Sequence, residues 1–210
     1  MNSDAKRTGR RGLLAGLLLT VAAPLSAIEE PEYRVVESDG AIEIRAYAAM
    51  VVAETQVGGS RERAGSRAFR TLFNYIDGEN RARTEIAMTA PVTQQKQSAK
   101  IAMTAPVTQQ QAADGWAVRF VLPASYTLAT APAPVDPAVT LREIPAHRAA
   151  VIRYSGTWSA SRYEEHLRAL RDWLDARGLE TAGEPVWARY DAPYVPWFLR
   201  RNEILLRLAP

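Results

Sequence analysis

The sequence contains few residues able to perform chemistry. Its only histidines are His147 and His166, and it has no cysteine, so a disulfide, a thiolate metal site, a cysteine nucleophile and a CxxCH cofactor attachment are all excluded. Two histidines cannot build a three-histidine zinc site, and the sequence has no phosphate-loop, dinucleotide-binding, serine-hydrolase or HExxH motif. The acidic residues are scattered, with no pair placed for acid–base work. This inventory favours a binding protein over an enzyme.

His166 is the better placed of the two histidines for contacting a ligand. It lies at the rim of the apolar stripe of a predicted helix over 159–177, and Trp173, seven residues later, shares that edge. A neutral imidazole beside an indole is a potential metal ligand. The alternative is a half-exposed helix histidine that makes one hydrogen bond. His147 follows Pro145 at the start of a predicted strand and is a lesser candidate.

Three arginines share one face of a second predicted helix, over 60–77, opposite its apolar stripe; they are Arg63, Arg67 and Arg70. Guanidinium groups in such a row can pair with an anionic ligand. The same pattern is also that of a solvated helix face.

A loop rich in proline and aromatic residues lies near the carboxyl end and contains Tyr194, Trp197 and Phe198. These side chains suit one wall of an apolar pocket. They suit equally well a cover over the core beneath the loop. A third alternative is an interaction surface, which requires the loop to be exposed and apolar.

A decamer, IAMTAPVTQQ, occurs twice, at 86–95 and 101–110. Two copies at this short spacing do not make a solenoid. Each copy reads as a β-type run that stops at its proline, because proline lacks an amide donor. Two adjacent strands in a hairpin would bring Met88 and Met103 together, as contact or soft axial groups. The alternative is a tandem duplication that fills the core.

The amino terminus reads as an export signal over residues 1–27. A basic start precedes an apolar run at 13–24 and a plausible cleavage site at Ala27. The pair Arg10-Arg11 resembles a twin-arginine signal, although general-export signals also carry paired arginines. An uncleaved anchor is the alternative. Export predicts a periplasmic or secreted protein.

Removal of that segment changes the charge of the chain. It carries four of the 26 basic residues and one of the 23 acidic residues. The remaining chain, 28–210, therefore has no net charge and no basic stripe for nucleic acid. Its length suits a single domain.

Alternating patterns and turn residues predict the following elements: a hairpin over 33–47, a strand over 49–57, a helix over 60–77, strands over 116–122, 139–144 and 148–154, a helix over 159–177, and strands over 187–190 and 202–208. The expected buried stripe of the first helix is Phe69, Leu72, Phe73 and Ile76. That of the second helix is Tyr163, Leu167, Leu170 and Leu174.

The two helices stand in equivalent surroundings about 100 residues apart. Each follows a strand and a glycine break, and each ends at a glycine, Gly78 or Gly178. We therefore predict an α+β fold built from two β-α-β-β repeats. Its antiparallel sheet would curl into a distorted β-barrel with two flanking helices.

Ordered motifs spanning most of the chain after the export signal resemble the SOUL heme-binding protein family. Besides the decamer they are EPEY at 30–33, IEIRAY at 42–47, FRTLFNYI at 69–76, VRFVLP at 118–123, AAVIRYSG at 149–156, ARYDAP at 188–193 and RNE at 201–203. The doubled decamer departs from the simpler single-copy pattern. The resemblance implies a duplicated β-α-β-β barrel, similar to gyrase-inhibitor-like effector-binding domains.

The resemblance also implies non-covalent binding of heme or another tetrapyrrole in a hydrophobic groove, as a carrier or buffer. The candidate contacts are Arg63, Arg67, Arg70, Phe73, Met88, Met103, His166, Trp173, Tyr194, Trp197 and Phe198, with His166 as the iron ligand. An axial histidine early in the fold has been proposed for some members, and this chain has no histidine before His147. The alternative is an effector-binding or hydrolytic domain for another small molecule, with a buried carboxylate such as Glu203 in a closed pocket.

Overall fold

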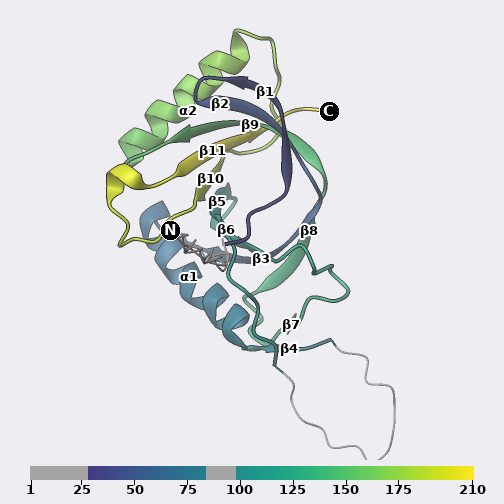
Figure 1. Cartoon of the computed structure of the whole chain (residues 1–210). Coiled ribbons are helices and arrows are strands. Elements are labelled where there is room, and N and C mark those ends of the chain that lie inside the picture. Colours follow the sequence, from purple (N-terminus) through teal and green to yellow (C-terminus); the bar gives the residue numbers. More distant parts are fainter. Residues whose placement is uncertain (1–27, 84–97) are drawn as a thin grey trace, which may run out of the picture.

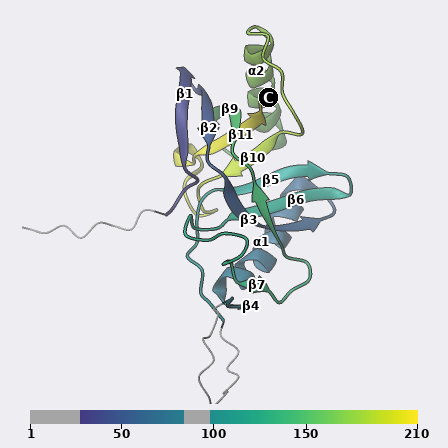
Figure 2. The ribbon, with the colours of Figure 1, turned by 90° about the vertical axis from the view of Figure 1, so that its right-hand side faces the viewer.

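The computed structural model describes residues 28–83 and 98–210 (Figure 1). The expected export segment and the first decamer copy, with Met88, lie outside these residues. The described chain forms a nine-stranded antiparallel sheet that curls into a half-barrel, with both helices on its outer face (Figures 1 and 2). The predicted α+β class and its two flanking helices are confirmed.

The elements follow the chain in the order β1 (Tyr33–Asp39), β2 (Ile42–Tyr47), β3 (Met50–Val57), α1 (Arg61–Asp77), β4 (Asn80–Arg81), β5 (Val107–Ala112), β6 (Gly115–Val121), β7 (Ala133–Pro134), β8 (Thr140–Ile144), β9 (His147–Tyr154), α2 (Ala160–Asp175), β10 (Val186–Arg189), the 3₁₀ helix η1 (Trp197–Leu199) and β11 (Asn202–Arg207). Neither helix of the described chain is long and apolar enough to cross a membrane.

The order of strands in the large sheet confirms the predicted duplication. It runs β1-β2-β9-β11-β10-β5-β6-β3-β8. Without β1, the order is the same from either end when β2 is matched with β8, β9 with β3, β11 with β6 and β10 with β5. The units β3-α1-β5-β6 and β9-α2-β10-β11 are therefore equivalent. The edge strands β1 and β8 do not pair with each other in the described chain, so the barrel stays open.

The second decamer copy does not follow the predicted pattern. Its strand, β5, begins after Pro106 instead of ending there. The prediction failed because the polar half of the decamer forms the strand, since Thr108, Gln109 and Gln110 are paired with both β6 and β10. Before the proline, Ile101 is buried against α1, whereas Met103 is 40% exposed.

Helix α1 begins and ends close to the prediction, but its buried face is different. It follows Ser60 and ends at Gly78, whose φ of 125° suits a residue without Cβ. Leu72 and Ile76 are buried as predicted, whereas Phe69 and Phe73 remain 38% and 39% exposed. Small side chains take their place against β3 and β6, because they allow the helix to lie closer to the sheet. The buried residues of α1 are Arg61, Ala64, Ala68, Leu72, Tyr75 and Ile76.

Helix α2 confirms its predicted stripe: Tyr163, Leu167, Leu170 and Leu174 are its buried residues. They pack on side chains such as Ile152 and Ile204, which point to the outer face of β9 and β11. The helix starts after Ser159, whose hydroxyl accepts a hydrogen bond from the Arg162 amide.

The inner face of the sheet holds a buried ion network centred on Glu203. Its carboxylate, 0% exposed, accepts hydrogen bonds from Arg45 Nη1 at 2.8 Å, Arg201 Nε at 2.9 Å and the Tyr190 hydroxyl at 2.8 Å. Burial alone would raise the pKa of Glu203, but the hydrogen bonds and charges of Arg45 and Arg201, with the hydrogen bond of Tyr190, outweigh it and hold this pKa below its ordinary value. The predicted burial of this carboxylate is correct, and the carboxylate is fully engaged by the protein itself.

We predict that Glu203→Gln lowers the free energy of unfolding by about 3 kcal/mol, because it leaves buried guanidinium groups without their counter-charge. Urea denaturation at pH 7 measures this change. Since the pKa of Glu203 is lowered on folding, its contribution is complete above the unfolded value of 4.5 and is lost as the pH falls through the folded value. The difference between the two proteins should therefore shrink in acid.

The matched control is Glu37→Gln, which removes an exposed carboxylate 3.5 Å from Arg177. It should change stability by less than about 1 kcal/mol at any pH. Equal effects of the two substitutions would contradict the structural role of the Glu203 network.

Candidate functional site

An apolar groove of about 580 Å³ lies beside α1 on the outer side of the sheet. We call it the α1 groove. Gly65, Ser66 and Phe69 of α1 form one wall. The remaining lining residues are Ile28, Met103, Thr104, Ala105, Val107, Gln109, Trp158, Arg189, Tyr190, Asp191, Ala192, Pro193 and Tyr194. Phe69 stays partly exposed because it lies in the groove wall. Its ring contacts Phe120 of β6 on one side and stacks on Phe73 at 5.9 Å on the other.

Alternating arginine and tryptophan side chains support the floor of the α1 groove. The Arg189 guanidinium lies 3.9 Å from the Trp187 ring centroid and 4.7 Å from that of Trp158. Arg61 covers Trp187 at 4.6 Å, and Arg200 covers Trp158 at 4.4 Å. Such contacts contribute about 0.5–2 kcal/mol each, more when desolvated. They fix a positive charge, that of Arg189, in the wall of an apolar groove.

The aromatic loop forms the lip of the α1 groove. Tyr194 lines it and is 88% exposed. Arg200 holds the loop by donating to the carbonyl oxygens of Val195 at 2.8 Å and Pro193 at 2.6 Å. Trp197 and Phe198 are 58% and 57% exposed and do not line the α1 groove. They neither wall the groove nor seal the core, and they satisfy the third alternative, that of an exposed apolar loop.

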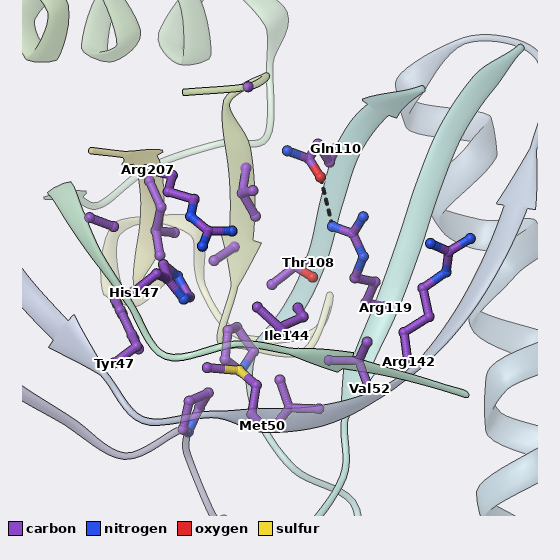
Figure 3. Close-up of a pocket in the computed structure, with 18 of the residues that line it drawn as sticks. Tyr47, Met50, Val52, Thr108, Gln110, Arg119, Arg142, Ile144, His147 and Arg207 are labelled. Carbon is purple, nitrogen blue, oxygen red and sulfur yellow. Dashed lines mark hydrogen bonds between the residues drawn. The ribbon is translucent and has the colours of Figure 1, made fainter. Parts of the chain in front are cut away.

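A second cavity, of about 390 Å³, lies on the opposite, inner face of the sheet. We call it the concave cleft (Figure 3). Its apolar surface includes Met50, Val52 and Ile144, and its charged groups lie to either side of them in Figure 3. Glu54 accepts from Arg119 Nε at 2.6 Å and pairs with Arg142 Nε at 3.1 Å.

His147 lines the concave cleft. Its Nδ1 lies 2.9 Å from the Pro145 carbonyl oxygen. A carbonyl only accepts, so the proton is assigned to Nδ1 and Nε2 keeps its lone pair. Its ring stacks on Tyr47 at 5.3 Å. Burial lowers the pKa of His147; the hydrogen bond to Pro145 opposes this shift and the charge of Arg207 reinforces it. The imidazole is therefore neutral at pH 7.

The structure brings only some of the predicted contacts together. Met103 and Tyr194 both line the α1 groove, and Phe73 adjoins it through Phe69. Arg63, Arg67 and Arg70 are exposed on α1 and do not line it.

His166 and Trp173 lie apart from the α1 groove. His166 stacks on Tyr154 at 4.0 Å, and its Nδ1 lies 2.7 Å from the Arg162 carbonyl oxygen. Trp173 donates to Asp39 Oδ2 at 2.9 Å, at the tip of β1. Neither side chain lines a described pocket, and the described chain has no group of three or more His, Asp or Glu side chains that could hold a metal.

Sequence reasoning missed Arg189, Trp158 and Gln109 as groove residues. Arg189 and Gln109 sit on strands, where only the partner strand and the face decide what a side chain meets. Trp158 precedes α2 and is fixed by a 2.8 Å hydrogen bond to the buried Asn202. No local sequence signal marks these long-range contacts. The exposed fraction of Phe69 was missed because a hydrophobic stripe does not show which of its edges stays open.

Comparison with known proteins supports the family and the fold. The SOUL heme-binding protein family matches residues 28–207. The chain has no significant match among curated proteins.

Solved structures share the fold at low sequence identity. The EcmrR C-terminal domain matches with a TM-score of 0.53 and 12% identity, over 84% of this chain and 98% of that one. EcmrR in a complex with DNA matches with a TM-score of 0.55 and 10% identity, over 80% and 56%. A hydrolase from Listeria innocua matches with a TM-score of 0.50 and 12% identity, over 80% and 91%. At these identities the likeness concerns the fold alone. The match over 28–207, together with the duplicated half-barrel and its two helices, shows that the chain belongs to the SOUL heme-binding protein family.

Proposed function

We propose that this protein is an exported, non-enzymatic carrier or buffer that holds heme or a related tetrapyrrole non-covalently in the α1 groove. The observation that carries the proposal is the groove itself, in a member of a heme-binding family. Family membership supports tetrapyrrole binding in general. The location, the mode of binding and the carrier role are our inference.

The groove residues fit a tetrapyrrole. The volume of about 580 Å³ lies within the range of small-molecule and cofactor sites. Aromatic rings at its walls, from Phe69, Trp158 and Tyr194, offer flat surfaces for a planar macrocycle. Arg189 places a positive charge in the same apolar groove, which suits the propionate carboxylates of heme. Because the sequence has no cysteine, attachment would be non-covalent.

Met103 is the one group in the described lining of the groove that can act as a soft axial ligand. It lies 40% exposed, so its thioether can adjust to a ligand. When bound, heme would supply a redox-active iron, and the protein would hold the macrocycle and limit its contact with water. Neither histidine lies in the groove.

Export rests on the amino-terminal pattern of residues 1–27. The family match begins at residue 28, directly after the expected cleavage site. This coincidence supports a mature protein that starts there and works in the periplasm or outside the cell.

We predict that the protein from Ile28 onward binds hemin one-to-one, with a saturable shift of the Soret band. Ser66→Glu should weaken binding about tenfold, because it places a carboxylate on the groove wall against the propionates. Position 66 is exposed and helical, so the fold should tolerate glutamate. The control is Ala169→Glu, which adds the same charge to the exposed face of α2 and should leave the affinity unchanged. A gradual, non-saturating change in absorbance would rule out a specific heme site.

We predict further that His147→Ala and His166→Ala each leave the spectrum of the hemin complex unchanged, since neither side chain lines the groove. Met103→Ala should alter the spectrum if the thioether ligates iron. Absorbance and magnetic circular dichroism measure both effects. If a histidine variant loses low-spin features, the macrocycle lies elsewhere than the α1 groove.

Export is tested by fusing residues 1–40 to a reporter enzyme that is active only outside the cytoplasm. Activity is expected, and Leu18→Arg in the apolar run should abolish it. Replacing Arg10 and Arg11 by lysine distinguishes the routes, because only twin-arginine transport requires the arginine pair. Activity that survives Leu18→Arg would contradict the proposed signal.

A further inference from the structure

The concave cleft is separated from the α1 groove by the sheet itself. Side chains alternate along a strand, so neighbouring residues of β5 and β10 face opposite sides. Val107, Gln109 and Arg189 face the groove, whereas Thr108, Gln110 and Ala188 face the cleft. A ligand in one cavity therefore touches different side chains from a ligand in the other, apart from Tyr190 at the end of β10, which lines both.

The two buried carboxylates near the inner face already have partners within the protein. Glu203 is held by Arg45, Arg201 and Tyr190, and is fully buried. Glu54 is 4% exposed and is shared by Arg119 and Arg142. Glu143 and Glu184 also line the cleft, but both residues are exposed to solvent. A cationic ligand would therefore find no buried carboxylate ready to receive it.

The guanidinium groups of the cleft have donors to spare. Arg119 uses Nε on Glu54 and Nη1 on Gln110 Oε1, at 2.9 Å. Arg142 uses Nε on Glu54, and its side chain is 57% exposed. Arg207 makes no ion pair or side-chain hydrogen bond with the described residues, and its guanidinium points toward the middle of the cleft in Figure 3. Three guanidinium groups thus face one buried carboxylate, that of Glu54, since the other two carboxylates of the lining are exposed.

We propose that the concave cleft is a second ligand site, which takes a small organic anion with a flat apolar body, such as an aromatic carboxylate. Its body would rest on Met50, Val52 and Ile144, and its acid group would meet Arg207 on one side or Arg142 on the other. His147 and Tyr47 form a stacked aromatic wall beside Arg207. The Nε2 lone pair of His147 adds one acceptor for a ligand hydroxyl.

The cavity size supports a ligand smaller than the one proposed for the groove. About 390 Å³ lies near the lower end of the range for small-molecule sites. Two fused aromatic rings with one carboxylate are of suitable size. The site thus selects by charge and by size, and it does not depend on heme binding at the α1 groove.

Isothermal titration calorimetry with 2-naphthoate and 2-naphthylmethylammonium, on the protein from Ile28 onward, tests the proposal. These probes share one apolar body and differ in the sign of their charge. We expect naphthoate to bind one-to-one and at least tenfold more tightly than the cation. Arg207→Gln should weaken naphthoate about tenfold. Ile144→Trp should abolish binding by filling the cleft.

Two controls separate this site from other surfaces. Arg168→Gln removes an exposed charge from α2 and should leave naphthoate binding unchanged. Ser66→Glu alters the α1 groove and should also have no effect, and saturating hemin should not displace naphthoate. The proposal is overturned if the cation binds as tightly as naphthoate, if Arg207→Gln binds like the parent, or if hemin competes. A failure of hemin to bind would affect only the proposed tetrapyrrole function.

Discussion

Four residue pairs between β5 and β10 join the unit β3-α1-β5-β6 to the unit β9-α2-β10-β11. Val107 pairs with Arg189, Thr108 with Ala188, Gln109 with Trp187 and Gln110 with Val186. The other strand pairs of the large sheet lie within one unit or involve the hairpin strands. Strand β2, which precedes the first unit, pairs with β9 of the second, and β8, which precedes the second unit, pairs with β3 of the first. The short β5–β10 seam therefore lies where the two units meet in the sheet. It also brings α1 and α2 to the same outer side (Figure 1).

Both cavities depend on this seam, because they occupy its two faces. On the outer face, α1 and α2 cover separate halves, and the α1 groove opens where the cover of α1 ends. On the inner face, neither helix of the described residues covers the sheet, and the curl of the strands makes the concave cleft. The inner face can hold buried charges because they are paired, above all Glu203 with Arg45 and Arg201. Paired charges thus occupy the inner face, where a second layer of helices would otherwise exclude water.

The sequence predicted both helices and most strands of the large sheet, because their signals are local, but it did not predict β4, β5 or β7. The Gly78 stop and the Leu167–Leu170–Leu174 stripe depend on neighbours within a few residues. The two similar segments about 100 residues apart predicted the duplicated β-α-β-β arrangement. The strand predicted from the decamer was wrong, since its polar Thr108–Gln110 segment pairs on both sides, and only the partner strands decide that such a segment is a central strand.

The candidate site was predictable only in part, for the same reason. Met103 and Tyr194 were found from residue type and from an unusual loop composition. Arg189 and Trp158 were not predicted, because the guanidinium of Arg189 lies over the ring of Trp158, a residue 31 positions earlier in the sequence. Arg63, Arg67 and Arg70 have a clear sequence pattern but do not line the groove. A regular row of charges on a helix is typical of its solvent-exposed face and need not mark a ligand site.

Charge in this protein is better understood by pairing than by counting. The chain after residue 27 has equal numbers of acidic and basic residues, which gives no reason to expect a preference for anions. The arginines near the inner face differ in how far carboxylates engage them. Arg45 and Arg201 are engaged by buried Glu203, Arg119 and Arg142 share Glu54, and Arg207 makes no ion pair with the described residues. Acidic side chains elsewhere, such as Glu37 and Asp39 with Arg177, balance the total at the surface without entering either cavity. A neutral protein can therefore offer a locally cationic cleft, and the selectivity of that cleft depends on which guanidinium groups already have a carboxylate partner.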